Sequence, residues 1–164
     1  MKTTWIERNT IVANLFNPAF CGEILRISIS NYNKHTNKNF PFALSFLILP
    51  ILLHKGTRDR MPRTVRSYFF VWVEENDDLF YNFPKRTKGM VKYTKEAISF
   101  LLANKKIEIT ELGDIIADPQ RAKQINNEDY EEYNEIIRKA EMLGKWLTAT
   151  TNVNSIYSFF RITP

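Results

Sequence analysis

The spacing of apolar residues predicts a chain made mainly of helices. Asn17 followed by Pro18 is a strong helix start, because asparagine caps a helix and proline fits its first position. Beyond them, apolar side chains recur at intervals of three and four residues, which predicts a helix over about 17–34. The polar stretch 33–39 then predicts a loop.

Three more helices are expected before residue 105. Nearly every residue of 42–53 is apolar, which predicts a helix over Pro41–His54 that is buried on most sides. Pro50 lies inside this segment and is expected to kink or restart the helix, because proline lacks a backbone donor. Proline starts and helical spacing predict the other two helices over Pro62–Glu75 and Pro84–Asn104.

The last third of the chain changes pattern twice. Alternation in residues 107–109 and 112–116, separated by a short turn, predicts a β-hairpin over Lys106–Ala117. Asparagines and acids at 126–129 then predict the start of a long helix over about 127–149. This helix carries small and apolar residues in steps of four and three, a packing seam of Tyr133, Ile137, Ala140, Gly144 and Leu147.

Three helices followed by a hairpin is the order of a winged helix-turn-helix. The expected fold is therefore mainly α with a small β-hairpin, and its winged helix-turn-helix core spans about 40–118. The N-terminal helix over 17–34 and the long C-terminal helix over 127–149 would flank that core. The chain has 164 residues and no Gly/Ser-rich linker, so a single domain over 1–164 is expected.

Composition argues against export, a membrane span and catalysis. The longest apolar run has 12 residues, whereas a bilayer span needs about 20, and no signal peptide precedes it, so a cytoplasmic location is expected. A single cysteine, Cys21, excludes an internal disulfide and a multi-cysteine zinc site. The two histidines, His35 and His54, stand in no catalytic motif. We therefore expect no enzyme activity, no cofactor and no metal.

The most informative feature of the sequence is positive charge. The net charge is +5, which favours an acidic partner. Cations gather in two segments, which supply the candidate nucleic-acid-binding residues Lys55, Arg58, Arg60, Arg63, Arg66, Lys85, Arg86, Lys88, Lys92 and Lys95. The alternative is that these charges serve solubility and pair with the acids at 74–78.

Helical geometry favours the nucleic-acid interpretation. In a helix over 84–104, Lys88, Lys92 and Lys95 fall within about 60° of one another around the axis, opposite Ala97 and Leu101. Lysines suit phosphate contacts, so any DNA binding is expected to depend little on base sequence. The hairpin carries Glu108, Glu111 and Asp114, which would repel phosphates, and it better suits a protein contact.

Aromatic residues crowd positions 68–83. Most are expected in the core, but both faces of the helix predicted there are aromatic. Large aromatics also anchor protein interfaces, so part of this surface is expected to bury against a partner. The candidate partner-binding residues are Phe70, Trp72, Phe80 and Tyr81.

Two blocks of the sequence resemble a known family, the small middle component of three-component ABC-ATPase systems. The blocks are Asn17-Pro-Ala-Phe-Cys-Gly-Glu-Ile-Leu25 and the apolar segment Phe40–Arg58, which is followed by Pro62. Leu143-Gly-Lys-Trp-Leu147 and the closing residues Phe159–Pro164 are also similar to the family, although Phe160-Arg161 stands where the family usually has Leu-Gly. The resemblance covers about residues 14–164.

This resemblance implies a non-enzymatic subunit of an anti-phage defence complex related to the Lamassu type. Such a subunit would bridge an SMC/Rad50-like ATPase and a nuclease-type effector, and would touch double-stranded DNA. Two alternatives stay open. One is a free-standing winged-helix transcriptional regulator that dimerises through the long seam helix, and the other is a small enzyme of unrecognised type.

Overall fold

Helix α2 (Pro18–Thr36) lies at the centre of the fold. The computed structural model describes residues 14–66, 68–149 and 152–163. Asn17 caps α2 as predicted, since its side chain accepts a hydrogen bond from the Ala19 amide at 2.8 Å. The helix runs into the predicted loop and ends at Asn37, which adopts a left-handed conformation with φ 53°.

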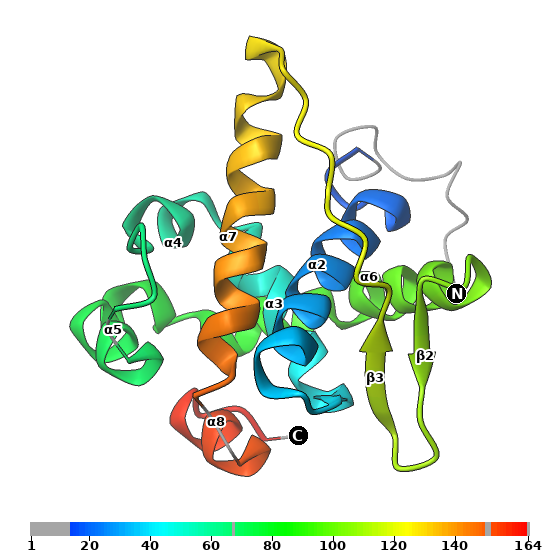
Figure 1. Ribbon diagram of the computed structural model, residues 1–164. Coiled ribbons are helices and arrows are strands. Elements are labelled where there is room, and N and C mark those ends of the chain that lie inside the picture. The colour runs from blue at the N-terminus through cyan, green and yellow to red at the C-terminus, as the bar shows by residue number, and fades with distance from the viewer. Residues whose placement is uncertain (1–13, 67, 150–151, 164) are drawn as a thin grey trace.

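The other elements confirm a mainly helical fold with a small sheet (Figure 1). In chain order they are β1 (Phe40–Pro41), η2 (Phe42–Leu44), α3 (Ser45–Leu52), α4 (Lys55–Arg60), α5 (Phe69–Glu75), η3 (Asp77–Phe80), α6 (Phe83–Ala103), β2 (Ile107–Ile109), β3 (Asp114–Ala117), η4 (Glu128–Tyr130), α7 (Glu131–Leu147) and α8 (Val153–Phe159). Helix α2 packs against α7, α6, α3 and β3. The helix that the sequence placed at the edge of the fold thus occupies its middle.

The predicted hairpin is present and belongs to a slightly larger sheet. Strands β2 and β3 pair antiparallel, with Ile109 opposite Ile115. The two-residue strand β1 adds to the other side of β3, with Phe40 opposite Ile115, so the strand order is β1-β3-β2. Pro41 lies on the edge of the sheet, where its missing amide proton interrupts no ladder.

The seam on α7 packs against α2 of the same chain. Ile137, Ala140 and Leu147 are almost fully buried, and Ser28 on α2 donates a side-chain hydrogen bond to the Ala140 carbonyl at 3.1 Å. A Cβ atom at Gly144 would overlap the carbonyl oxygen of Ser28 and lie 3.0 Å from Asn31 Cβ. The helices therefore cross where α7 has no side chain.

The apolar segment predicted as one helix over Pro41–His54 is divided: Pro41 belongs to β1, a 3-10 turn, η2, follows, and α3 ends at Leu52. The separate helix α4 begins just beyond the segment, at Lys55. Pro50 is accommodated inside α3 and is fully surrounded by other residues. Within the described ranges, no helix is both long enough and apolar enough to cross a membrane.

The helix predicted over Pro62–Glu75 is wrong in its first half, because α5 begins only at Phe69. Met61 is extended (ψ 134°), as the residue before a proline prefers. Lys139 on α7 holds this segment by donating to the carbonyls of Met61 and Pro62 at 2.9 and 3.2 Å. These two hydrogen bonds tie the segment before α5 to a residue far along the chain.

Helix α5 is held by aromatic rings from two distant parts of the chain and from the neighbouring turn η3. Phe69 meets Trp146 edge-on at 5.4 Å and Phe160 at 5.9 Å. Trp72 packs on Trp146 at 5.2 Å and on Phe80 at 5.6 Å. These contacts join α5 to the end of α7 and to the residue that ends α8, which lies below α7 in Figure 1.

Candidate nucleic-acid and partner interface

Two of the ten predicted nucleic-acid-binding residues are structural caps of helix α3. The last carbonyls of a helix have no partner within the helix. Arg58, only 2% exposed, donates to the Leu52 carbonyl at 2.8 Å and forms an ion pair with Glu132 on α7. Arg86 donates from Nε to the Pro50 carbonyl at 3.0 Å. Both guanidinium groups therefore complete the end of α3 and do not belong to the exposed basic surface.

The environment of Arg86 supports a structural role. Its guanidinium lies 5.2 Å above the ring of Phe83, and burial lowers the pKa of Arg86 from its usual value. One terminal nitrogen of this side chain is buried without a hydrogen-bond partner among the described residues. Arg86 is thus half-buried and engaged by the fold.

Two more of the predicted cations are paired with acids at the surface. Lys55 contacts Asp59 at 2.8 Å, and Arg60 contacts Asp78 at 2.7 Å. Such exposed pairs contribute little to stability, but each partner cancels the charge that a phosphate would meet. The alternative of pairing with neighbouring acids is thus confirmed for Arg60.

The remaining predicted cations are exposed. Arg63 and Arg66 lie in the segment between α4 and α5, and Lys85 lies in the first turn of α6. Lys88, Lys92 and Lys95 form what we call the lysine ridge, since all three are exposed on the helix α6. Across residues 14–66, 68–149 and 152–163, no acid lies within ion-pair distance of the ridge. No described acid therefore offsets the charge of the ridge through an ion pair.

The ridge stands on a firmly held helix. The opposite face of α6 buries Met90, Ala97 and Leu101 against the core, and α6 packs against α2 and α3. Lys92 lies 4.7 Å from the centre of the Tyr93 ring, which itself stacks on Phe16 at 4.1 Å. The spacing of the three lysines is therefore set by the helix.

A groove that the sequence analysis missed runs beside the ridge. It has a volume of about 590 Å³ and lies between the η2–α3 segment, α6, and α8 with the residues after it. Its apolar lining includes Phe42, Phe46 and Val91. Lys88, Lys95 and Arg161 also line it. We call it the apolar groove. Its only sequence signals are Phe42 and Phe46 one helical turn apart, and Thr87 and Val91 likewise.

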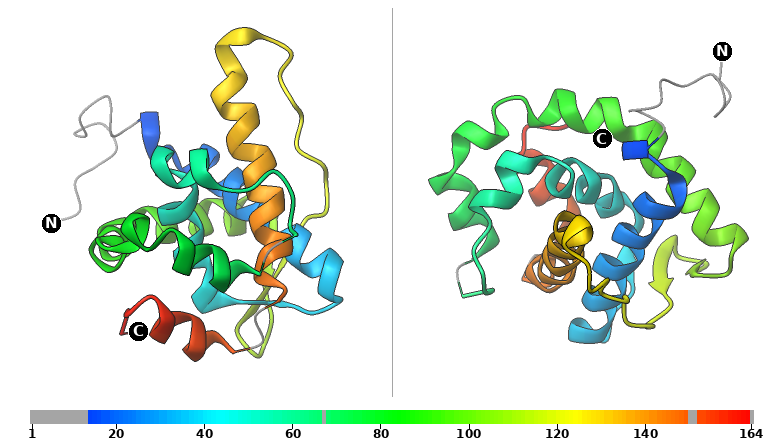
Figure 2. Two further views of the ribbon diagram at one scale, coloured as in Figure 1. Left: turned by 90° about the vertical axis from the view of Figure 1, so that its left-hand side faces the viewer. Right: turned by 90° about the horizontal axis from the view of Figure 1, so that it is seen from above.

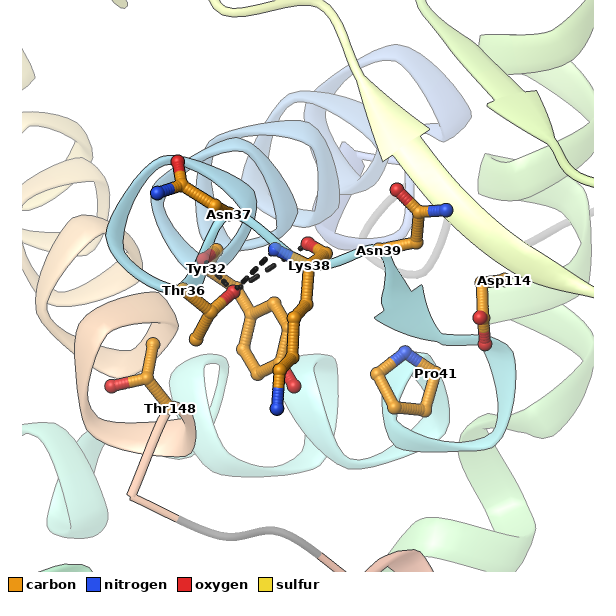
Figure 3. A pocket seen from close by; sticks show the side chains of 8 residues that line it. All are labelled: Tyr32, Thr36, Asn37, Lys38, Asn39, Pro41, Asp114 and Thr148. Carbon is orange, nitrogen blue, oxygen red and sulfur yellow. Dashed lines mark hydrogen bonds between the residues drawn. The ribbon is translucent and has the colours of Figure 1, made fainter.

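A second hollow is polar and holds no recognisable reaction centre (Figure 3). It lies where α2 ends, between Tyr32, the loop Asn37–Asn39 and Asp114. The Lys38 side chain is drawn below the loop in Figure 3, and the Lys38 amide donates a hydrogen bond to the Thr36 hydroxyl at 3.1 Å. Among the described residues that line it, Lys38 and Asp114 are the charged ones, and neither pairs with a nucleophile there. The residues around this hollow form the C-terminal end of α2 and the loop that follows it.

The predicted partner-binding aromatics divide into buried and exposed residues. Trp72 is 4% exposed and donates its indole N–H to the Arg60 carbonyl at 3.0 Å. Phe70 packs on Phe159 at 4.6 Å, and Phe80 is held between Trp72 and the Phe83 ring. Phe70 and Phe80 are half-buried, and Tyr81, 86% exposed, is the most exposed member of this set. Leu112 at the hairpin tip, 90% exposed, is a further apolar contact point.

The histidines and the cysteine serve the fold. His54 caps α4, since its Nδ1 accepts from the Thr57 amide at 3.2 Å. His35 is bonded to the Asn31 carbonyl at 2.7 Å. Among the residues that the structure describes, no three His, Cys, Asp or Glu side chains gather as a metal site would require.

The buried thiol of Cys21 leads to a testable prediction. Burial raises the pKa of Cys21 to about 12, so about one thiol in ten thousand is ionised at pH 8. Iodoacetamide is therefore expected to label the folded protein at a rate set by unfolding, and to label it readily in denaturant. Mass spectrometry of native and denatured samples measures both rates. Fast labelling of the folded chain at pH 8 would contradict this description of Cys21.

The comparison with known proteins gives one family. The model of the family described as ABC-three component (ABC-3C) system Middle Component 3 matches residues 5–164. No curated protein and no solved structure matches the chain.

Proposed function

Since this chain belongs to the Middle Component 3 family of ABC-three component systems, we propose that it is a non-catalytic accessory subunit of an anti-phage complex. In this proposal the subunit bridges the ATPase and effector components and contacts duplex DNA without reading its sequence. The ATPase would be SMC/Rad50-like, the effector would be of nuclease type, and the system would be related to Lamassu.

The lysine ridge carries the DNA part of the proposal. Three exposed lysines, with no acidic partner among the described residues, lie on one rigid helix, Lys88 and Lys95 being about 10 Å apart along its axis. Lysine ammonium groups bind phosphates as point charges and release counterions, which supplies non-specific affinity. In a winged-helix arrangement α6 would be the helix laid along the duplex. The proposal itself requires only an exposed helix with this charge.

Opposite charge on a separate element supports the bridging part. The N-terminal end of α7 stands away from the other helices in Figure 1 and in the left view of Figure 2. Around it lie the exposed acids Glu128, Asp129 and Glu131. A subunit with a basic helix on one element and an acidic projection on another can contact two partners of different charge.

The burial of the α7 seam argues against the alternative of a dimeric transcriptional regulator. It required the seam of α7 to bind a second copy, but Ile137, Ala140 and Gly144 are buried against α2. The non-catalytic role is supported by the thiol of Cys21, which is buried with a raised pKa, and by His54, which is engaged as a cap.

Reversing the ridge tests the DNA contact. We expect the triple variant Lys88→Glu, Lys92→Glu, Lys95→Glu to bind duplex DNA at least tenfold more weakly at low salt. Its slope of log K against log salt should be less steep by about 0.9 for each phosphate that the ridge no longer neutralises. The matched control reverses Lys34, Lys123 and Lys145, which are exposed outside α6 and change the net charge equally. Fluorescence anisotropy with a duplex of random sequence measures both. Equal losses of affinity in the two triple variants would refute a specific role of the ridge.

A further inference from the structure

The apolar groove has the chemistry of a peptide-binding site. Its volume of about 590 Å³ lies within the range of about 300–1,000 Å³ typical of ligand pockets. Three separate elements form it, and Phe42 and Phe46 meet edge-on at 5.6 Å on one side. Tyr157 donates its hydroxyl to the Ala43 carbonyl, which fixes α8 against the η2 side. The groove is therefore held in shape by contacts within the chain.

The charged residues known to line the groove are all positive. Lys88, Lys95 and Arg161 are exposed, and none of the described Asp or Glu residues lines the groove. None of the three belongs to an ion pair within the described ranges. A ligand that offers apolar groups to the lining and carboxylates to these cations would match both properties.

A buried hydroxyl adds a third requirement. Thr87 lines the groove and is 4% exposed, yet its Oγ1 has no hydrogen-bond partner among the described residues. A helical threonine commonly bonds the carbonyl of the preceding turn, and a buried polar atom without a partner is costly. A polar atom of a bound chain can satisfy this hydroxyl.

We propose that the apolar groove binds an acidic amphipathic segment of another component of the system, and this identity of the partner rests on the proposed function. Apolar side chains of the segment enter between Phe46 and Val91, while its carboxylates meet Lys88, Lys95 and Arg161. A duplex presents phosphates and no apolar side chains, so it does not match the lining. The recognition mode is that of an amphipathic segment in a groove.

The groove shares two lysines with the lysine ridge. Lys88 and Lys95 line the groove, whereas Lys92 does not. The same ammonium groups cannot neutralise phosphates and segment carboxylates together. Segment binding and DNA binding therefore oppose each other, and thermodynamic linkage requires the effect to be reciprocal.

The test uses the intact protein and 15-residue synthetic peptides that tile the sequences of the other two components. We expect at least one acidic amphipathic peptide to bind, and Val91→Glu or Lys95→Glu to weaken it at least tenfold. Lys92→Glu is the matched control, because it lies on the same helix outside the groove and is expected to leave peptide affinity within twofold. Circular dichroism melting curves establish that each variant is folded.

The absence of any bound acidic peptide would overturn the groove proposal. Equal losses of peptide affinity with Lys92→Glu and Lys95→Glu, or full affinity in Val91→Glu, would do the same. A second copy of this chain in the groove would show as a dimer that Val91→Glu dissociates, and this also counts against it. Competition is measured separately by adding the peptide to a DNA complex, where DNA affinity should fall at least tenfold. Peptide binding without any DNA affinity would refute the proposed DNA contact of the lysine ridge and would leave the groove proposal standing.

Discussion

Gly144→Ala is expected to lower the free energy of unfolding by about 3 kcal/mol, because overpacking at a close helix crossing forces the backbones apart. The new Cβ would overlap the Ser28 carbonyl oxygen, which is backbone and cannot rotate away. For a chain of this length the loss of stability corresponds to a drop in melting temperature of about 6–12 °C. Urea denaturation followed by circular dichroism measures the change.

Gly89→Ala is the matched control for this prediction. A Cβ at Gly89 on α6 would meet nothing within 4 Å, and the residue is exposed. Alanine is favoured over glycine inside a helix, so this variant is expected to gain about 0.5–1 kcal/mol. Opposite signs for the same chemical change would establish that the crossing of α2 and α7 sets the cost. Equal changes in stability for Gly144→Ala and Gly89→Ala would show that α2 and α7 can move apart to accommodate the new methyl group.

Arg58→Met is expected to lower the free energy of unfolding by about 2 kcal/mol. The substitution leaves the Leu52 carbonyl without its donor, and an unpaired buried polar group costs about 1–3 kcal/mol. Glu132 is 67% exposed and returns to water at little cost, so the carbonyl dominates. Arg58→Lys should recover only part of the stability, because an ammonium group cannot serve both partners as the guanidinium fork does.

This experiment also separates the two roles that the sequence allowed for Arg58. The control is Arg66→Met, since Arg66 is an exposed arginine in the segment after α4. We expect Arg66→Met to leave the unfolding midpoint unchanged. If Arg58→Met instead left stability unchanged and weakened DNA binding, Arg58 would be a phosphate contact and not a helix cap.

The sequence predicted those elements whose ends are set by residues within or next to the element itself. Asn17 and Pro18 mark the start of α2, and alternation marks the hairpin strands β2 and β3. The start of α5 was missed because Lys139, far along the chain, holds the segment before it. Strand β1 and helices α4 and α8 were also missed, because each is short and depends on contacts with distant residues.

Charge density alone could not separate structural cations from exposed ones. In the sequence, Arg58 and Lys88 are both cations within a basic segment, and the charge pattern does not distinguish them. The fold uses two arginines, Arg58 and Arg86, for buried carbonyls, because a guanidinium carries several donors and is less strongly hydrated than an ammonium group. The lysines of α6 stay in water. The helical spacing of Lys88, Lys92 and Lys95 did predict their common exposure, because it depends on α6 alone.

The wall that residues 157–163 contribute to the apolar groove has a consequence for the timing of assembly. Translation produces this segment after every other part of the groove. Phe160 then closes the aromatic cluster around Phe69, and Tyr157 fixes α8 beside Ala43. A nascent chain whose residues 157–163 are still inside the ribosome would lack this wall of the groove. Recruitment through the groove would therefore select subunits whose folding has reached this late segment.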